Sequence, residues 1–207
     1  MRAELLLIGG TLDIPGVASA PYSTVLFLQD SKRKILVDPG SFVTHQFLEE
    51  KLKERGLDVE DITDILLTHF HLDHAFNTVF FPRATIYLHE AYKDKDYSKF
   101  GMIVGKLYTM VLQSWKEVVT LKGGEKLFGV VEVFHTPWHA KEHVSFIIET
   151  ENMGKIFFPG DICFTRLNYY EMYKGYRSDG VARFVLEHAR KADLIVFTHD
   201  RPLTPFS

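Results

Sequence analysis

The segment Thr68-His69-Phe70-His71-Leu72-Asp73-His74-Ala75 places three histidines and one aspartate within six consecutive positions. It follows Ile65-Leu66-Leu67, an apolar run typical of a buried strand. Neutral imidazole is the commonest metal ligand, and a neighbouring carboxylate suits zinc, iron or manganese. Because side chains alternate along a strand, His69 and His71 would lie on one side, with Asp73 and His74 in the turn that follows. The segment can therefore supply ligands to two adjacent metal ions.

The composition is that of an ordinary globular domain. The chain has 207 residues, of which 46% are hydrophobic and 14% aromatic, so we expect one domain over residues 1–207. The net charge of −3 offers no electrostatic footprint for nucleic acid, and a small molecule is the expected partner. The single cysteine, Cys163, excludes an internal disulfide framework. The apolar run at positions 5–8 is too short for a signal peptide or a membrane span, so we expect a cytoplasmic protein without a membrane partner.

Strands and helices alternate without a repeat or a linker. Thr44 and Ser178 are the expected caps of two helices. Because hairpins occur beside helical crossovers, the order favours an α+β fold, with sheets covered by helices, over a purely parallel α/β fold. Apolar patterns predict strands over 25–29, 34–37, 64–68, 84–88, 130–134, 144–150, 155–158 and 194–198, and helices over 46–55, 102–115 and 178–191.

The predicted helix over 102–115 is apolar on more than one face. A surface helix needs only one apolar stripe, so we expect the additional apolar residues to be buried in a second contact. Three interpretations are open: the helix is sunk in the core, it roofs the metal cleft, or it packs against another subunit. The last would make the protein a homo-oligomer.

Further ligand candidates follow three other predicted strands. His139 lies in Thr-Pro-Trp-His, Asp161 in Pro-Gly-Asp, and His199 in Thr-His-Asp. Each alone is more often a capping or surface residue. Their joint placement after strand ends, where active sites of layered folds gather, makes a shared site the stronger interpretation.

The order His-x-His-x-Asp-His, Thr-Pro-x-His, Gly-Asp and Thr-His resembles the metallo-β-lactamase superfamily. Asp38, in Leu-Val-Asp-Pro-Gly, matches an early aspartate motif of that family, and the motifs span about residues 25–200. One departure is Trp138, which stands where the family usually has glycine. The resemblance implies a small single-domain member with a four-layer αββα sandwich and metals at one edge, between the two sheets.

The resemblance also implies a ligand set. His69, His71 and His139 would hold a first metal, Asp73, His74 and His199 a second, and Asp161 would bridge them. Asp38 would orient a ligand imidazole through a hydrogen bond. The expected cofactor is two divalent metal ions per chain, with zinc the first choice and iron, manganese or nickel as alternatives.

The chemistry implied by this set is hydrolysis by a metal-bridging hydroxide, with Asp73 and Asp161 as the catalytic carboxylates. The substrate would be an ester, thioester, lactone or phosphodiester. One alternative is a sulfur dioxygenase that uses a single iron. Another is a small nuclease or phosphodiesterase acting on nucleic acid, and a third is a metal-binding protein without turnover.

Some branches of the superfamily fit this sequence poorly. True β-lactamases usually lack an aspartate at the position of Asp161, so antibiotic hydrolysis is not expected. Eight residues follow His199 (207 − 199 = 8), which leaves no room there for the helical domain of the glyoxalase II branch. Acyl-homoserine lactonases carry a catalytic tyrosine where this chain has Phe164.

Other polar residues near the motifs have less certain roles. His135 and His143 flank the His139 loop, and ordinary structural roles are expected for both. Cys163 is interpreted as a small buried thiol. The loop expected after Asp161 is polar and aromatic, and two interpretations of it, substrate contact and ordinary surface, are weighted equally. It contains Arg166, Asn168, Tyr169 and Tyr170.

Overall fold

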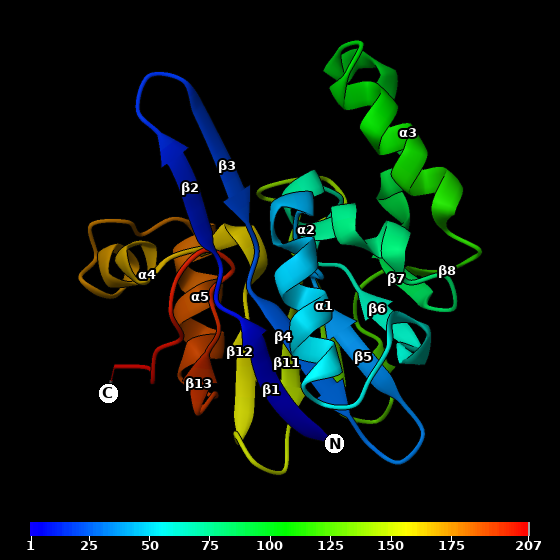
Figure 1. Cartoon of the computed structure of the whole chain (residues 1–207). Coiled ribbons are helices and arrows are strands. Elements are labelled where there is room, and N and C mark those ends of the chain that lie inside the picture. The colour runs from blue at the N-terminus through cyan, green and yellow to red at the C-terminus, as the bar shows by residue number, and fades with distance from the viewer. Residues whose placement is uncertain (207) are drawn as a thin grey trace.

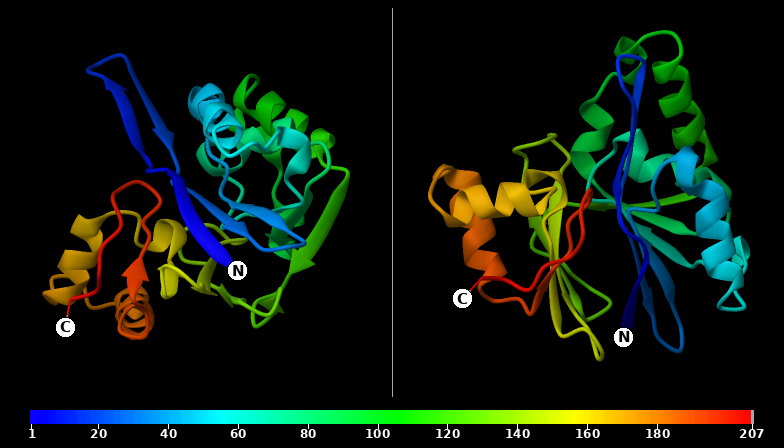
Figure 2. Two further views of the ribbon diagram at one scale, coloured as in Figure 1. Left: turned by 60° about the horizontal axis from the view of Figure 1, so that its bottom comes forward. Right: turned by 60° about the vertical axis from the view of Figure 1, so that its left-hand side comes forward.

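A computed structural model describes residues 1–206. Two β-sheets face each other, and helices cover the outer face of each, so the layers run helix, sheet, sheet, helix (Figure 1). The same layering is visible from two further directions (Figure 2). The predicted α+β sandwich of four layers is confirmed.

The first sheet has six strands in the order β1-β4-β5-β6-β7-β8. The strands from β1 to β5 pair antiparallel, whereas β5 to β8 pair parallel. Their bounds are β1 Arg2–Leu7, β4 Val25–Gln29, β5 Lys34–Val37, β6 Asp64–Leu66, β7 Thr85–His89 and β8 Glu117–Leu121.

The second sheet has five strands in the order β13-β12-β11-β10-β9, all antiparallel except the β12–β13 pair. A separate hairpin of β2 and β3 projects from the body of the molecule (Figure 1). The bounds are β9 Lys126–Leu127, β10 Val131–His135, β11 Val144–Glu149, β12 Lys155–Phe158, β13 Leu194–Ile195, β2 Gly10–Ile14 and β3 Ala18–Tyr22.

Alternation along the strands explains why two sheets and two helical layers form. In β4, Leu26 and Leu28 pack between the sheets, while Val25 and Phe27 pack under the helices of the first layer. In β11, Val144, Phe146 and Ile148 pack between the sheets, while Ile147 packs under the helices of the second layer. Because neighbouring side chains point to opposite faces, strands that are apolar throughout must be buried on both sides.

The helices supply the outer layers. Helices α1 and α3 pack on the first sheet, and α4 and α5 on the second. Their bounds are α1 His45–Lys53, α2 Leu72–Ala75, α3 Val104–Ser114, α4 Arg166–Tyr173 and α5 Gly180–Ala189. Short 3-10 helices span Phe42–Thr44, Val59–Asp61, Phe76–Phe80, Glu90–Asp94, Tyr97–Phe100 and Gly160–Ile162.

Of the two expected helix caps, Thr44 is confirmed in position but not in its side-chain hydrogen bond, and Ser178 is wrong. Thr44 is the N-cap residue of α1, but its hydroxyl donates to the carbonyl of Ser41 (2.9 Å) and accepts no hydrogen bond from the first turn of α1. At α5 the cap is Asp179, whose carboxylate accepts from the backbone N–H of Ala182 (2.8 Å). A carboxylate caps well because it accepts from the free N–H groups and faces the positive end of the helix dipole.

The segment after Asp161 is also a helix, where a loop was expected. Thr165 caps α4 by accepting from the N–H of Asn168 (3.2 Å). The predicted last strand is shorter than expected, because β13 ends at Ile195. The hairpin of β2 and β3, and strands β1, β8 and β9, were not predicted.

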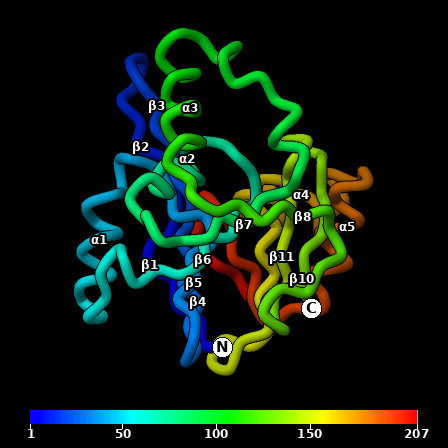
Figure 3. The backbone as a smooth tube through the Cα atoms, turned by 90° about the vertical axis from the view of Figure 1, so that its right-hand side faces the viewer, coloured from blue at the N-terminus to red at the C-terminus, as the bar shows by residue number. Residues whose placement is uncertain are grey.

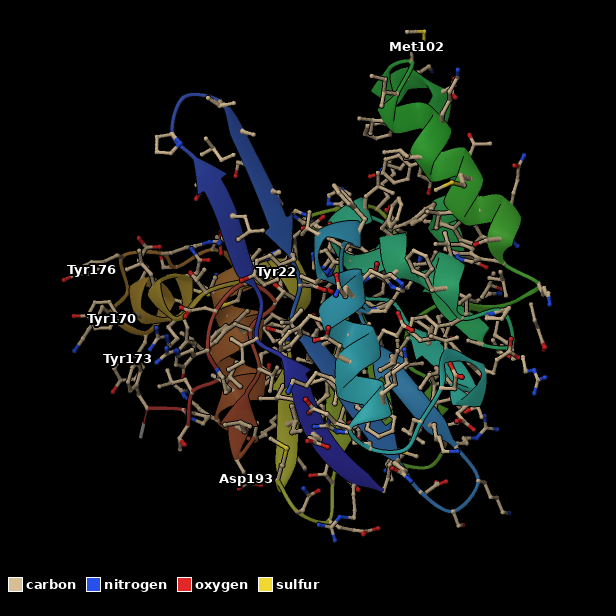
Figure 4. All side chains as sticks on the ribbon, in the orientation of Figure 1. Tyr22, Met102, Tyr170, Tyr173, Tyr176 and Asp193 are labelled. Carbon is tan, nitrogen blue, oxygen red and sulfur yellow. The ribbon has the colours of Figure 1, made fainter. Side chains whose placement is uncertain are left out.

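Helix α3 is not sunk in the core. It buries Tyr108 and Val111 in the core of the first layer, where Tyr108 packs on Phe70 (5.1 Å between ring centroids). Met110 of α3 and the two residues before the helix, Met102 and Ile103, remain exposed. The tube view shows that α3 and the loop before it project from the body of the molecule (Figure 3). Met102 lies at the outer end of this projection (Figure 4). A homo-oligomer through this face stays a prediction. Among the helices of residues 1–206, none has the length and apolar character needed to cross a membrane.

Candidate metal centre

All seven predicted ligands gather at one edge of the sandwich. They follow the ends of β6, β10, β12 and β13, which bring both sheets to the same place. Backbone hydrogen bonds join the sheets here: Thr24 donates to Thr198 (2.6 Å), and Val144 donates to Thr68 (2.7 Å). The site thus lies where segments of the first sheet are hydrogen-bonded to segments of the second sheet.

The first segment differs from its expected geometry. Strand β6 ends at Leu66, so His69 and His71 lie beyond the strand, and alternation does not align them. His71 is instead the residue before α2, whose first turn carries Asp73 and His74. The turn still brings the rings of His69 and His71 to 4.4 Å between centroids.

Six of the seven side chains fall into two neighbouring sets. His69, His71 and His139 offer nitrogens that lie within 4.8 Å of one another, and so do the ligand atoms of Asp73, His74 and His199. In the first set, His139 Nε2 lies 3.1 Å from His71 Nδ1. In the second, Asp73 Oδ2 lies 3.4 Å from the Nε2 atoms of both His74 and His199.

Asp161 lies between the two sets and directs one oxygen to each. Its Oδ2 is 3.9 Å from His69 Nε2 and 3.6 Å from His139 Nε2. Its Oδ1 is 3.4 Å from His74 Nε2 and 3.6 Å from His199 Nε2. This division is what a carboxylate shared by two cations requires.

Three imidazoles have their tautomer set by a partner outside the cluster. The Nδ1–H of His69 donates to the hydroxyl of Thr68 (3.0 Å), which itself donates to Asp38. His74 Nδ1 donates to Asp38 Oδ2 (2.8 Å), and His199 Nδ1 donates to the carbonyl of Tyr22 (3.1 Å). In each ring the lone pair of Nε2 is left facing the cluster, as metal ligation requires.

Buried atoms without partners show that a cation fits between these side chains. Within residues 1–206, Nε2 of His69 and Nε2 of His74 are buried and accept no hydrogen bond. A buried polar atom without a partner carries a substantial desolvation cost. Nitrogens and carboxylate oxygens converging with free lone pairs are the donor set that zinc and similar divalent ions prefer.

Burial and neighbouring charges act differently on the members of the cluster. Burial lowers the pKa of His69 far below its usual range and that of His71 to about 4, so both rings are neutral. Burial opposes a charge on His74 as well, but the carboxylates of Asp161, Asp73 and Asp38 outweigh it and raise its pKa. Despite burial, which works in the other direction, His74 lowers the pKa of Asp73 to about 2. These three carboxylates thus stabilise a positive charge at the position of His74.

His143 has a larger part at the site than the sequence indicated. It is fully buried, and its Nε2 accepts from the backbone N–H of Asp161 (2.9 Å), so its Nδ1–H donates to Thr136 (2.8 Å). Burial lowers the pKa of His143 to about 3, which keeps the ring neutral and able to accept. His143 therefore fixes the backbone of Asp161. Its position just before a buried strand was the available signal.

Gly160 allows this approach of His143 to Asp161. Its φ is +64°, and a Cβ there would lie 2.4 Å from Nε2 of His143 and 3.2 Å from Thr68 Cβ. We expect Gly160→Ala to lower the free energy of unfolding by about 1–3 kcal/mol more than Gly175→Ala. Gly175 has a similar φ of +77° and open space, so it controls for backbone strain. Thermal or urea unfolding measures both variants; equal losses would contradict the packing role of Gly160.

The remaining polar residues have simpler surroundings. His135 stacks on His89 with centroids 3.8 Å apart, away from the ligand sets. Cys163 is buried, and burial raises the pKa of its thiol to about 12, as its interpretation as an unreactive thiol requires. Tyr169 is buried among the apolar side chains of the second helical layer, whereas Arg166 pairs with Asp200 beside His199 (3.0 Å).

Helix α4 presents aromatic side chains to solvent. Tyr170, Tyr173 and Tyr176 point outward from the α4 end of the molecule (Figure 4). The side chain of Trp138 is half exposed and packs against Phe184 of α5 (5.5 Å between ring centroids). The loop that carries His139 thus rests on the second helical layer.

Comparison with known proteins agrees with this fold and site. The family model described as metallo-beta-lactamase superfamily matches residues 19–199. The chain belongs to the metallo-beta-lactamase superfamily, whose members bind divalent metals, commonly zinc. Membership of this family supports a metal-dependent hydrolase.

Relatives and solved structures give more detail. A Thermotoga maritima crystal structure, provisionally described as a metallo-beta-lactamase, is 49% identical, with a TM-score of 0.94 and 99% of each chain covered. A probable metallo-hydrolase of Methanocaldococcus jannaschii is 32% identical over 62% of this chain and 64% of its own length. An N-acyl homoserine lactonase of a Bacillus species is 26% identical over 78% of this chain and 68% of its own length. The chain thus spans about two thirds of these two curated relatives.

Proposed function

We propose that this protein is a dinuclear metallohydrolase. His69, His71 and His139 hold the first ion, Asp73, His74 and His199 hold the second, and Asp161 bridges them. The observation that carries this proposal is the division of Asp161, with Oδ2 facing one histidine set and Oδ1 facing the other. A site for one iron would leave the second set without a cation. The dinuclear assignment is therefore favoured over the mononuclear dioxygenase.

When bound, a pair of divalent ions lowers the pKa of a water and polarises the oxygen of the scissile group. The chain's own residues place these charges. Thr198 donates to Asp161 Oδ1 (2.6 Å), and His143 accepts from the Asp161 N–H, so the bridging carboxylate is held from two sides. Asp73, ionised at neutral pH, is the second carboxylate at the reacting centre.

For the substrate we propose an ester or lactone, with thioester and phosphodiester as further candidates. N-acyl homoserine lactonases occur among the relatives, which supports a cyclic or open carboxylic ester. Phe164 lies 6.1 Å from the ring of His199, where acyl-homoserine lactonases carry a catalytic tyrosine. A phenyl ring cannot donate a hydrogen bond to the leaving oxygen. Activity on acyl-homoserine lactones should therefore be weaker than on activated esters.

The test starts from protein stripped of metal by a chelator and reloaded with zinc. We expect two zinc ions per chain by elemental analysis. The reloaded protein should hydrolyse 4-nitrophenyl esters or N-hexanoyl homoserine lactone, and the stripped protein should be inactive. Bis(4-nitrophenyl) phosphate tests the phosphodiester candidate. One iron per chain in the protein as purified, with oxygen consumption on a persulfide and no ester hydrolysis, would instead establish the dioxygenase.

A further inference from the structure

A cavity opens directly beside the first histidine set, His69, His71 and His139. It has a volume of about 530 Å³, and His71 and His139 form part of its wall. The rest of the lining comes from residues 140–142 and from the segment between β7 and α3 that contains the 3-10 helices Glu90–Asp94 and Tyr97–Phe100. A substrate whose scissile bond lies at the metal centre would extend into this cavity on the His71 side.

Lys95 and Glu142 form the most buried charged pair of this cavity. The Lys95 ammonium lies 3.4 Å from Glu142 Oε1, and its side chain is 25% exposed, compared with 1% for Glu142. Of the two residues, only Lys95 therefore keeps surface for a ligand. Lys95 also lies over the ring of Phe100, at 5.2 Å from its centroid. The pair and the ring together fix a cation at the wall of the cavity.

The other charges around the cavity are solvated or already paired. Asp96 accepts from the N–H and hydroxyl of Ser98 (3.2 and 2.6 Å) and pairs with Lys99 (3.5 Å). Asp94 and Lys141 are exposed at the rim. Among the described residues 1–206, Glu142 is the one acceptor for Lys95, and an ammonium has three N–H donors. Lys95 can thus accept a further anionic partner from inside the cavity.

We propose that this cavity binds an anionic group of the substrate, a carboxylate or a phosphoryl group, and that Lys95 pairs with it. The inference rests on the proposed hydrolase function and narrows its substrate class. The preferred substrate carries its negative charge on the side of the scissile bond that faces His71 and His139. Lys95 is then a specificity-determining residue, since it discriminates charged from neutral substrates.

The experiment compares two 4-nitrophenyl esters of equal chain length, the anionic succinate monoester and the neutral butyrate. In the zinc-loaded protein we expect kcat/KM for the succinate ester to exceed that for the butyrate about tenfold. Lys95→Gln should abolish this preference, chiefly through a higher KM for the succinate ester. Lys95→Arg should keep it. Lys106→Gln removes an exposed lysine of α3 outside the cavity and should leave the ratio unchanged.

Two further measurements separate the possible outcomes. Lys95→Gln leaves the Glu142 carboxylate buried without its partner. The double variant Lys95→Gln/Glu142→Gln removes both charges, and the ratio of kcat/KM between the two esters is measured again in this variant. Recovery of the preference in the double variant would overturn the proposal, because Lys95 would then only neutralise Glu142. If neither ester is hydrolysed, the proposed function fails, and calorimetric titration with succinate tests the cavity alone. Binding that is lost in Lys95→Gln supports the anion site, and absence of binding refutes it.

Discussion

Replacement of Asp161 by alanine is expected to abolish hydrolysis and to reduce the metal content from two ions per chain. The substitution removes one oxygen from each ligand set and leaves two dications without the carboxylate that screens them from each other. We expect kcat/KM to fall by at least about a hundredfold. Elemental analysis and ester hydrolysis on the same preparation measure both effects.

The matched control is Glu187→Ala, which removes an exposed carboxylate paired with Lys191 on α5. An exposed pair of this kind contributes little, so metal content and rate should match the parent protein. If Asp161→Ala keeps two ions and normal turnover, Asp161 is not the bridge.

The second large effect is expected from Asp38→Asn. The buried carboxylate accepts from the backbone N–H of Thr68 (2.8 Å), from the Thr68 hydroxyl (2.7 Å) and from His74 Nδ1 (2.8 Å). An amide in its place keeps the shape but offers one acceptor oxygen and one NH₂ donor group. If the NH₂ group faces His74, the ring must accept at Nδ1 and carry its proton on Nε2. It then cannot bind a metal through Nε2.

We therefore expect Asp38→Asn to weaken binding of the second ion by about 10–100-fold, with the fold retained. Asp64→Asn is the control, because Asp64 is equally buried but lies at the start of β6 and pairs with Arg33 (2.8 Å). Its loss should lower stability without changing metal affinity. Zinc titration with a competing chelator and thermal unfolding distinguish the two. Normal zinc affinity in Asp38→Asn would contradict the orienting role of Asp38.

Much of the fold could be predicted, because local pattern and burial agree along most strands. The apolar runs over 25–29 and 155–158 coincide with β4 and β12, since both are buried on two faces. The hairpin of β2 and β3 was not predictable, because Leu12 and Ile14 are exposed and no core selects a pattern there. The start of α5 was missed by one residue, since serine and aspartate at 178 and 179 are both good caps.

The gathering of the seven site residues was predictable because each follows a strand end and the motif order is specific. The supporting contacts were not. The hydrogen bond from His199 to the carbonyl of Tyr22 joins residues 177 positions apart. His143 reaches Asp161 only because the backbone turns at Gly160 with positive φ. Such contacts depend on tertiary geometry, which spacing along the chain does not determine. The domain limits, 1–207, stay a prediction.

The most direct test of a dinuclear site is a crystal structure of the zinc-loaded protein with anomalous data collected at the zinc edge. We expect two anomalous peaks about 3.5–4 Å apart. Each of the seven side chains, His69, His71, Asp73, His74, His139, Asp161 and His199, should lie about 2.0–2.2 Å from a peak. Asp161 should contact both. A single peak, or Asp73 and His199 more than about 3 Å from any peak in a filled site, would contradict the dinuclear assignment.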